Sequence, residues 1–163
     1  MRLVLAVALL ALMSTIPVGA EEDPNRAIQW NWTLQPADAA PGSEAELVLV
    51  AALAPHWVVY SSDFRAEIGP LPARLRKKAH SSVQLVEGLR SISASRKKDE
   101  SLNVEYGYFA GRAELRQRIR LPVDGSPAEL TLSGQACNET DGTCHLIRQD
   151  ISIASRVASH SRS

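Results

Sequence analysis

The sequence predicts an all-β domain, best described as a sandwich of two sheets, and three observations support this prediction. Segments with apolar–polar alternation, or with many β-branched and aromatic residues, recur along residues 28–153. Turn signals that contain Pro and Gly separate these segments. None of the segments has a convincing amphipathic helical pattern. Together they give about seven to nine short strands, a number typical of a sandwich, and a barrel is the alternative.

The first three strands are predicted near the start of this region. Ile28–Leu34 alternates strictly between apolar and polar residues, which is typical of a half-buried strand. Residues 44–53 fit a helix or a strand by composition. Their Val-Leu-Val centre and the flanking turn signals, such as Pro41-Gly42, favour a strand. Trp57–Tyr60 combines aromatic and β-branched residues and predicts the third strand.

The second half of the region contains the remaining strands. Residues 73–98 are polar and basic, and we expect short strands and loops there. Tyr106–Phe109 begins an aromatic segment. In residues 113–121 uncharged side chains, all apolar except Gln117, alternate with charged ones, which predicts a long strand with one charged face. Leu130–Leu132 and Ile147–Ile153 are the last predicted strands.

Residues 1–20 have the features of a secretory signal peptide. Arg2 precedes an apolar run over Leu3–Met13, and Val18-Gly19-Ala20 is a small-x-small ending. The run is short for a membrane span, so we expect cleavage before Glu21 rather than an uncleaved anchor. The mature protein would then be exported, with no stable membrane insertion.

The composition limits the partners that are expected. The chain has 18 Lys and Arg and 18 Asp and Glu residues, so it is nearly neutral with or without the signal peptide. This balance gives no electrostatic reason to expect nucleic acid as a partner. We divide the mature chain into a loose leader (residues 21–27), one domain (28–153) and a disordered tail (154–163).

The chain has two cysteines, Cys137 and Cys144, and they lie between the last two predicted strands. Asp141-Gly142 is a turn signal, so the pair brackets the tip of a predicted hairpin. In an exported domain such a pair is expected to form a disulfide. Strand pairing already closes a hairpin, so a bridge there adds less stability than one between distant segments. The residues alone leave a structural staple and a redox site equally open.

Other chemistry has less support. The spacing Cys-x6-Cys-His is unlike common zinc sites, and the only Met residues lie in the signal peptide, so no metal site is expected. No Ser/His/Asp constellation or phosphate loop indicates a hydrolase or a nucleotide enzyme. His145 would stabilise a Cys144 thiolate if it were protonated, but an ordinary exposed histidine is the simpler interpretation.

Four segments together resemble the N-terminal periplasmic domain of the DsbD family of thiol:disulfide interchange proteins. They are the aromatic stretch 55–61, the Gly-Pro-rich bend 69–72, the aromatic loop and strand 106–121, and Gly134–Cys137 with Cys144. Their order and spacing carry the likeness, which covers most of residues 28–153.

The resemblance implies an immunoglobulin-like sandwich with a reversible disulfide and no cofactor. It implies a protein-disulfide reductase that takes electrons from a membrane electron-transfer protein through a thioredoxin-like domain and passes them to periplasmic disulfide oxidoreductases. Cys144 would form the mixed disulfides and Cys137 would resolve them. The family has a mobile aromatic cap over the cysteines, and Tyr106, Tyr108 and Phe109 are the candidates, Phe109 first. Core packing is the alternative role for these rings.

The chain also differs from well-known members of that family. Its cysteines are separated by six residues instead of five, and His145-Leu146-Ile147 stands where many members have prolines. It contains neither a transmembrane bundle nor a Cys-x-x-Cys motif, so a separate partner would supply both. The rival hypothesis is a non-catalytic periplasmic binding or assembly module with a structural disulfide, which would dock partners at an edge strand.

Overall fold

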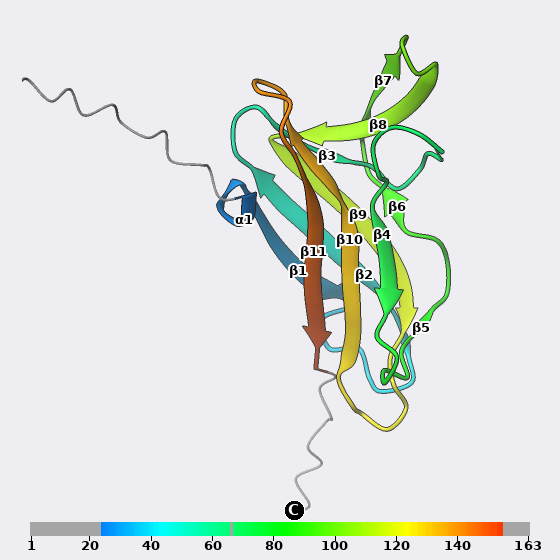
Figure 1. Cartoon of the computed structure of the whole chain (residues 1–163). Helices are drawn as coiled ribbons and strands as arrows, with labels where there is room; N and C mark the ends of the chain where they lie inside the picture. Colours follow the sequence, from blue (N-terminus) through cyan, green and yellow to red (C-terminus); the bar gives the residue numbers. More distant parts are fainter. Residues whose placement is uncertain (1–23, 66, 155–163) are drawn as a thin grey trace, which may run out of the picture.

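The computed structural model describes residues 24–65 and 67–154, and it is almost entirely β-structure (Figure 1). The predicted signal peptide and all of the predicted tail except Ala154 lie outside the described residues. The strands are β1 (Ile28–Gln35), β2 (Glu44–Leu53), β3 (Trp57–Tyr60), β4 (Arg74–Lys77), β5 (Gln84–Leu85), β6 (Arg90–Ser91), β7 (Ser95–Asp99), β8 (Val104–Ala110), β9 (Arg112–Arg120), β10 (Ala128–Asn138) and β11 (Cys144–Ile153). Pro24–Ala27 forms a single helical turn, α1, where we expected an irregular leader. No helix among the described residues is long and apolar enough to cross a membrane.

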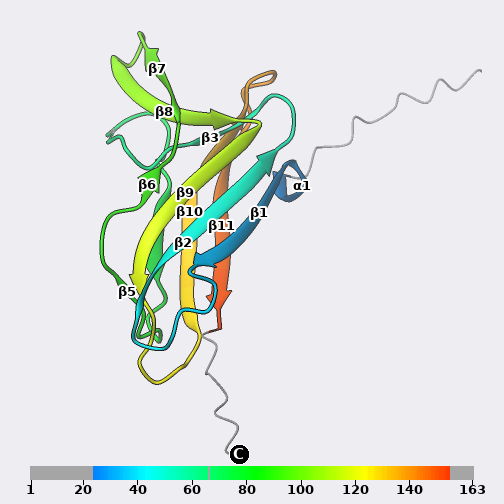
Figure 2. The ribbon, with the colours of Figure 1, turned by 180° about the vertical axis from the view of Figure 1, so that it is seen from behind.

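The strands form two antiparallel sheets that pack face to face (Figures 1 and 2). One sheet has the order β1-β2-β9-β5, and β6 also pairs with β9. The other has the order β11-β10-β3-β8-β7, and β4 also pairs with β10. The predicted all-β sandwich is therefore confirmed, with β11 and β7 at the two ends of the second sheet.

Side-chain alternation builds the core between the two sheets. Leu47 and Leu49 of β2, Leu115 of β9 and Leu130 of β10 are fully buried there. On β9 and β10 the residues that face outward are mostly polar, whereas on β2 the apolar Val48 lies between Leu47 and Leu49. Along β9 the outward residues are charged as predicted, and their ion pairs with acidic neighbours include Arg116 with Glu46 (2.9 Å).

The last two strands are longer than the sequence indicated. β10 continues through Ser133, Gly134, Gln135 and Ala136 to the cysteine, and β11 begins at Cys144 itself. Gly134 and Ala136 are the inward-facing residues of this part of β10. Because they are small, they give little apolar periodicity, and the strand pattern in the sequence fades before the hairpin tip.

One end of the sandwich gathers the segments that surround the cysteines. The β10–β11 turn, the turn between β2 and β3, and the β7–β8 hairpin all lie at this end (Figures 1 and 2). β10 pairs with β3 through Cys137↔Val58, and β3 pairs with β8 through Tyr60↔Tyr108. The cysteine hairpin is therefore joined through the sheet to the aromatic strand β8.

Candidate redox site

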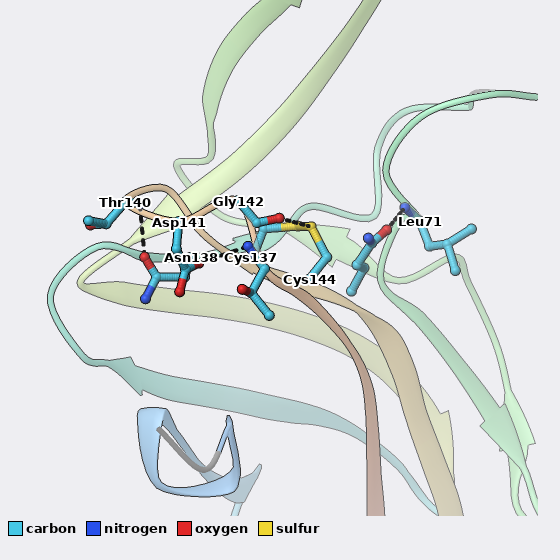
Figure 3. The surroundings of a disulfide bond; sticks show 9 residues. Leu71, Cys137, Asn138, Thr140, Asp141, Gly142 and Cys144 are labelled. Carbon is cyan, nitrogen blue, oxygen red and sulfur yellow. Dashed lines mark hydrogen bonds between the residues drawn. A yellow bond between two sulfur atoms is a disulfide. The ribbon is translucent and has the colours of Figure 1, made fainter. Parts of the chain in front are cut away.

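Cys137 and Cys144 are bonded to each other at the end of the β10–β11 ladder (Figure 3). They are directly opposite in the strand register, with Cα atoms 4.1 Å apart and an S–S distance of 2.04 Å. Directly opposed residues of antiparallel strands point to the same face of the sheet. The predicted disulfide is confirmed, and it lies on the outer face of the second sheet.

The turn beyond the disulfide is held by hydrogen bonds among its own residues. The Asn138 N–H donates to the Thr143 carbonyl (2.8 Å), and the Gly142 N–H donates to the Asn138 carbonyl (2.9 Å). The side-chain oxygens of Asn138 and Asp141 accept the N–H groups of Thr140 and Thr143, at 2.8 Å each (Figure 3). Gly142 has a φ of 74°, a conformation that glycine adopts without strain. These hydrogen bonds hold the predicted Asp-Gly turn in addition to the bridge.

The two sulfur-bearing residues differ in exposure. Cys144 is exposed, whereas Cys137 is only 7% exposed. The Cys144 sulfur lies 3.7 Å from the Gly142 carbonyl oxygen, at the open end of the turn. Because exchange requires an incoming thiolate to approach one sulfur, Cys144 is the residue that a partner can attack.

An aromatic cluster covers Cys137. Tyr60 of β3, Phe64 in the loop that follows and Tyr106 of β8 are buried together with this cysteine and Val58. The ring centroids of Tyr60 and Tyr106 are 5.3 Å apart, and the Phe64 ring lies 6.5 Å and 6.1 Å from these two. We call Tyr60, Phe64 and Tyr106 the aromatic cover.

The three aromatic residues proposed from the sequence lie on different faces of β8. Tyr106 and Tyr108 share the outer face with the cysteines, and Tyr108 lines a surface pocket of about 270 Å³ together with both of them. Phe109 instead points into the core between the sheets and is 4% exposed. Neighbouring residues of a strand point to opposite faces, so Phe109 cannot share the face of Tyr108. This position fits the core-packing role and corrects our first choice of cap residue.

Phe64 is the site residue that the sequence did not reveal. It follows Ser61-Ser62-Asp63 and belongs to no alternating pattern. Its burial depends on the loop after β3 folding back. The contacts that hold this loop include a hydrogen bond from the Ser62 side chain to the Leu89 carbonyl (2.8 Å) and the pairing of Arg96 with Asp63 (2.5 Å). The only feature of the sequence that could have indicated Phe64 is that it is an aromatic residue close to the end of the predicted strand Trp57–Tyr60.

The polar groups near the cover are largely neutralised. Burial raises the pKa of Tyr60 to about 12, and the nearby Tyr106 and Glu139 add to this shift. Glu139 forms a salt bridge with Lys97 of β7 (3.7 Å), and its backbone N–H donates to the His56 carbonyl (2.8 Å). Tyr60 is therefore an uncharged phenol at neutral pH, and it places no negative charge beside the buried sulfur.

His145 lies behind the disulfide rather than over it. It follows Cys144 on β11, so its side chain points to the opposite face of the sheet. There its ring lies against Trp57, with centroids 5.7 Å apart. Asp141 has a lowered pKa, chiefly because its carboxylate accepts hydrogen bonds from Thr143, with His145 as a smaller influence. Any effect of His145 on Cys144 would therefore be a longer-range electrostatic effect and not a direct contact between the two side chains.

The described residues offer no obvious metal ligands around the bridge. Across 24–65 and 67–154, no three His, Cys, Asp or Glu side chains gather closely enough to hold a metal ion.

Comparisons with known proteins identify the fold. No family model and no curated protein sequence matches this chain. Among solved structures, the reduced N-terminal domain of DsbD from Neisseria meningitidis matches with a TM-score of 0.54 and 16% identity, over 81% of this chain and 88% of that chain. The N-terminal periplasmic domain of ScsB from Proteus mirabilis matches with a TM-score of 0.57 and 17% identity, over 86% of this chain. The match covers 49% of the ScsB chain, so this protein spans about half of it.

A third similar structure is a complex between the DsbD N-terminal domain and the PilB N-terminal domain from Neisseria meningitidis. It matches with a TM-score of 0.53 and 13% identity, over 82% of this chain and 87% of that chain. At these identities the likeness establishes the fold. The chain has the fold of the DsbD N-terminal domain, as the resemblance in its sequence indicated.

Proposed function

We propose that this chain is an exported thiol–disulfide exchange domain that relays reducing equivalents through Cys137 and Cys144. The observation that carries the proposal is the asymmetry of the bridge. Its two cysteines are directly paired, but one is exposed at a hairpin tip and the other is buried under the aromatic cover. A bridge that only stapled the hairpin would need neither the exposed sulfur nor the cover.

Exchange at this site follows from which sulfur is accessible. A partner thiolate attacks Cys144 Sγ, a mixed disulfide forms, and the sulfur of Cys137 leaves as a thiolate. The second cysteine of the partner then attacks the mixed disulfide and releases Cys144. The partner dithiol has become a disulfide, and the Cys137–Cys144 bridge has taken up two electrons and, at neutral pH, up to two protons.

The same roles serve the onward step. The Cys144 thiolate attacks the disulfide of an exported oxidoreductase, and Cys137 resolves the mixed disulfide by attacking Cys144 Sγ. The bridge reforms and the oxidoreductase leaves reduced. The aromatic cover keeps thiols away from Cys137 in both steps, so exchange proceeds through Cys144 at the exposed hairpin tip.

The proposed partners and location follow the fold neighbours. One neighbour is a periplasmic domain of ScsB, and another is a complex of the DsbD domain with a domain of PilB. By analogy we propose a periplasmic location after signal-peptide cleavage. A thioredoxin-like domain or a membrane electron carrier would be the electron donor, and a periplasmic disulfide oxidoreductase the acceptor.

One observation favours a non-catalytic alternative. β11 is an edge strand of the second sheet, so another chain could pair with it. On this alternative the protein is a binding or assembly module, and the bridge is structural.

A redox titration separates the two functions. The mature protein is equilibrated with glutathione or thioredoxin buffers, and the fraction of reduced Cys137–Cys144 is measured by thiol alkylation. Exchange proteins have potentials between about −120 and −270 mV, whereas structural bridges lie below about −300 mV. In parallel, Cys137→Ala should trap a partner through Cys144, and Cys144→Ala should trap none. A potential below −300 mV with no trapped partner would establish the structural alternative.

A further inference from the structure

An apolar groove lies beside Cys144 on the outer face of the second sheet. It encloses about 420 Å³, and its lining includes Leu71, Pro72, Arg74, Gly134, Leu146 and Arg148. Leu146 is 75% exposed and Leu71 is 50% exposed, which is unusual for large apolar side chains. Water therefore covers apolar surface next to the sulfur that a partner must reach.

The groove and the sulfur share one face of β11. Cys144, Leu146 and Arg148 alternate on the outer side of this strand, and two strand residues span about 7 Å. In a partner whose cysteine reacts with Cys144, polypeptide segments flank that cysteine on both sides. One of these flanking segments comes within reach of Leu146.

The groove is held open by contacts between distant parts of the chain. The Leu71 N–H donates to the side-chain oxygen of Gln135, at 2.8 Å (Figure 3). A Cβ on Gly134 would lie 3.2 Å from the Cα of Ala73, so the segment that carries Leu71 lies directly on β10. Binding in this groove would therefore require little ordering of the chain, which favours recognition.

The groove is also basic. Neither Arg74 nor Arg148 forms a salt bridge with any described residue. The pKa of Asp150 is lowered chiefly by hydrogen bonds from Thr131 and Lys78 and least by the nearby Arg148, and this carboxylate is already paired with Lys78 (3.1 Å). On the other side of the disulfide, by contrast, Lys97 is neutralised by Glu139. The groove side therefore offers positive charge that no salt bridge with a described residue neutralises.

We propose that this groove binds the segment that flanks the reactive cysteine of the redox partner, and that this segment carries an apolar side chain and an acidic side chain. The proposal rests on the proposed exchange function and names the chemistry of its partner. The apolar side chain would cover Leu71 and Leu146, and the carboxylate would pair with Arg74 or Arg148.

Activated peptides test this proposal. Four pentapeptides share a central cysteine. The residues next to the cysteine are either Leu or Ser, and the terminal residues are either Glu or Lys, in all four combinations. Each cysteine is activated as a mixed disulfide with nitrothiobenzoate. In Cys137→Ala the Cys144 thiolate attacks the peptide sulfur, a Cys144–peptide disulfide forms, and nitrothiobenzoate leaves as a coloured thiolate. Each rate is divided by the rate with the nitrothiobenzoate dimer, a small disulfide without flanking residues.

We expect the Leu/Glu peptide to react about tenfold faster than the Ser/Lys peptide, with the other two in between. Adding Leu146→Ser and Arg148→Ser should remove this preference. The control adds Val123→Ser and Arg76→Ser instead. These residues are also an exposed apolar residue and an exposed arginine, but they do not line the groove, so the preference for the Leu/Glu peptide should remain.

The outcomes separate this proposal from the proposed function. If Cys144 is reactive but all four peptides react at equal rates, the proposed recognition by the groove is wrong and the exchange function is unaffected. A Cys144 that does not react even with the small disulfide would overturn exchange itself. Sedimentation that shows a dimer abolished by Leu146→Ser would assign the groove to a second copy of the chain and overturn the proposed partner.

Discussion

Gly107 lies so close to Ser61 that a Cβ at position 107 would come within 2.2 Å of Ser61 Oγ. Ser61 cannot easily move away, because it is fully buried and its backbone is bonded to Gly107 (2.9 Å) and to Ala73 (3.0 Å). This contact ties β8 to the loop that carries Phe64. The absence of a side chain at position 107 is therefore a condition for assembling the aromatic cover.

Gly107→Ala should destabilise the protein, because the added methyl group overpacks a buried contact. We expect a loss of about 1–3 kcal/mol in the free energy of unfolding, measured by urea denaturation. Gly88→Ala is the matched control, since a Cβ there meets nothing within 4 Å. Adding Ser61→Ala should recover part of the loss by removing Oγ. Equal stability of the two glycine variants would show that Ser61 yields to the methyl group.

Phe64→Ala should open the aromatic cover. The ring packs on Tyr60 and Tyr106, so its loss should expose Cys137 and cost about 3 kcal/mol of stability. We expect reduction of the bridge by dithiothreitol to become several-fold faster under native conditions. Phe109→Ala, which removes a ring from the core, should cost similar stability without this gain in rate. The same acceleration in both variants would mean that instability, and not the cover, controls access to the bridge.

Alternation predicted the strands that have a single apolar face, whereas β2 and β3 were predicted from their β-branched and aromatic residues. β1 and β9 each have one apolar face against the core, so a period of two was visible. β8 is different, because both of its faces are partly buried: Phe109 packs in the core and Tyr106 under Phe64. A strand buried on both sides loses the alternation, so the sequence could not show which of its rings face the cysteines.

Only part of the candidate site was predicted from the sequence. The hairpin tip is local, and the Asp141-Gly142 signal together with the two cysteines was enough to place it. The cover and the groove depend on loops that fold back from far along the chain, such as the contact between Leu71 and Gln135. Such contacts depend on the packing of the whole sandwich and leave no pattern of spacing in the sequence.

The raised pKa of Tyr60 predicts a loss of stability at high pH. The unfolded phenol ionises near pH 10, whereas burial in the folded state raises the pKa to about 12. Between these values the unfolded state binds fewer protons, so stability is full below pH 10 and falls as pH rises towards 12. The contribution is at most about 3 kcal/mol. Tyr60→Phe should flatten this part of the stability profile. The same slope in Tyr60→Phe would assign the loss to other groups.

The difference in burial between the two cysteines predicts unequal thiol reactivity. In Cys137→Ala the remaining thiol of Cys144 is at the exposed tip, whereas in Cys144→Ala the thiol of Cys137 lies under the aromatic cover. Iodoacetamide should therefore alkylate Cys144 at least about tenfold faster, because the thiolate must be accessible to react. Both thiols should react alike in urea, which controls for intrinsic differences. Equal rates in the folded variants would mean that the cover opens once the bridge is broken, and that Cys137 is protected only in the oxidised protein.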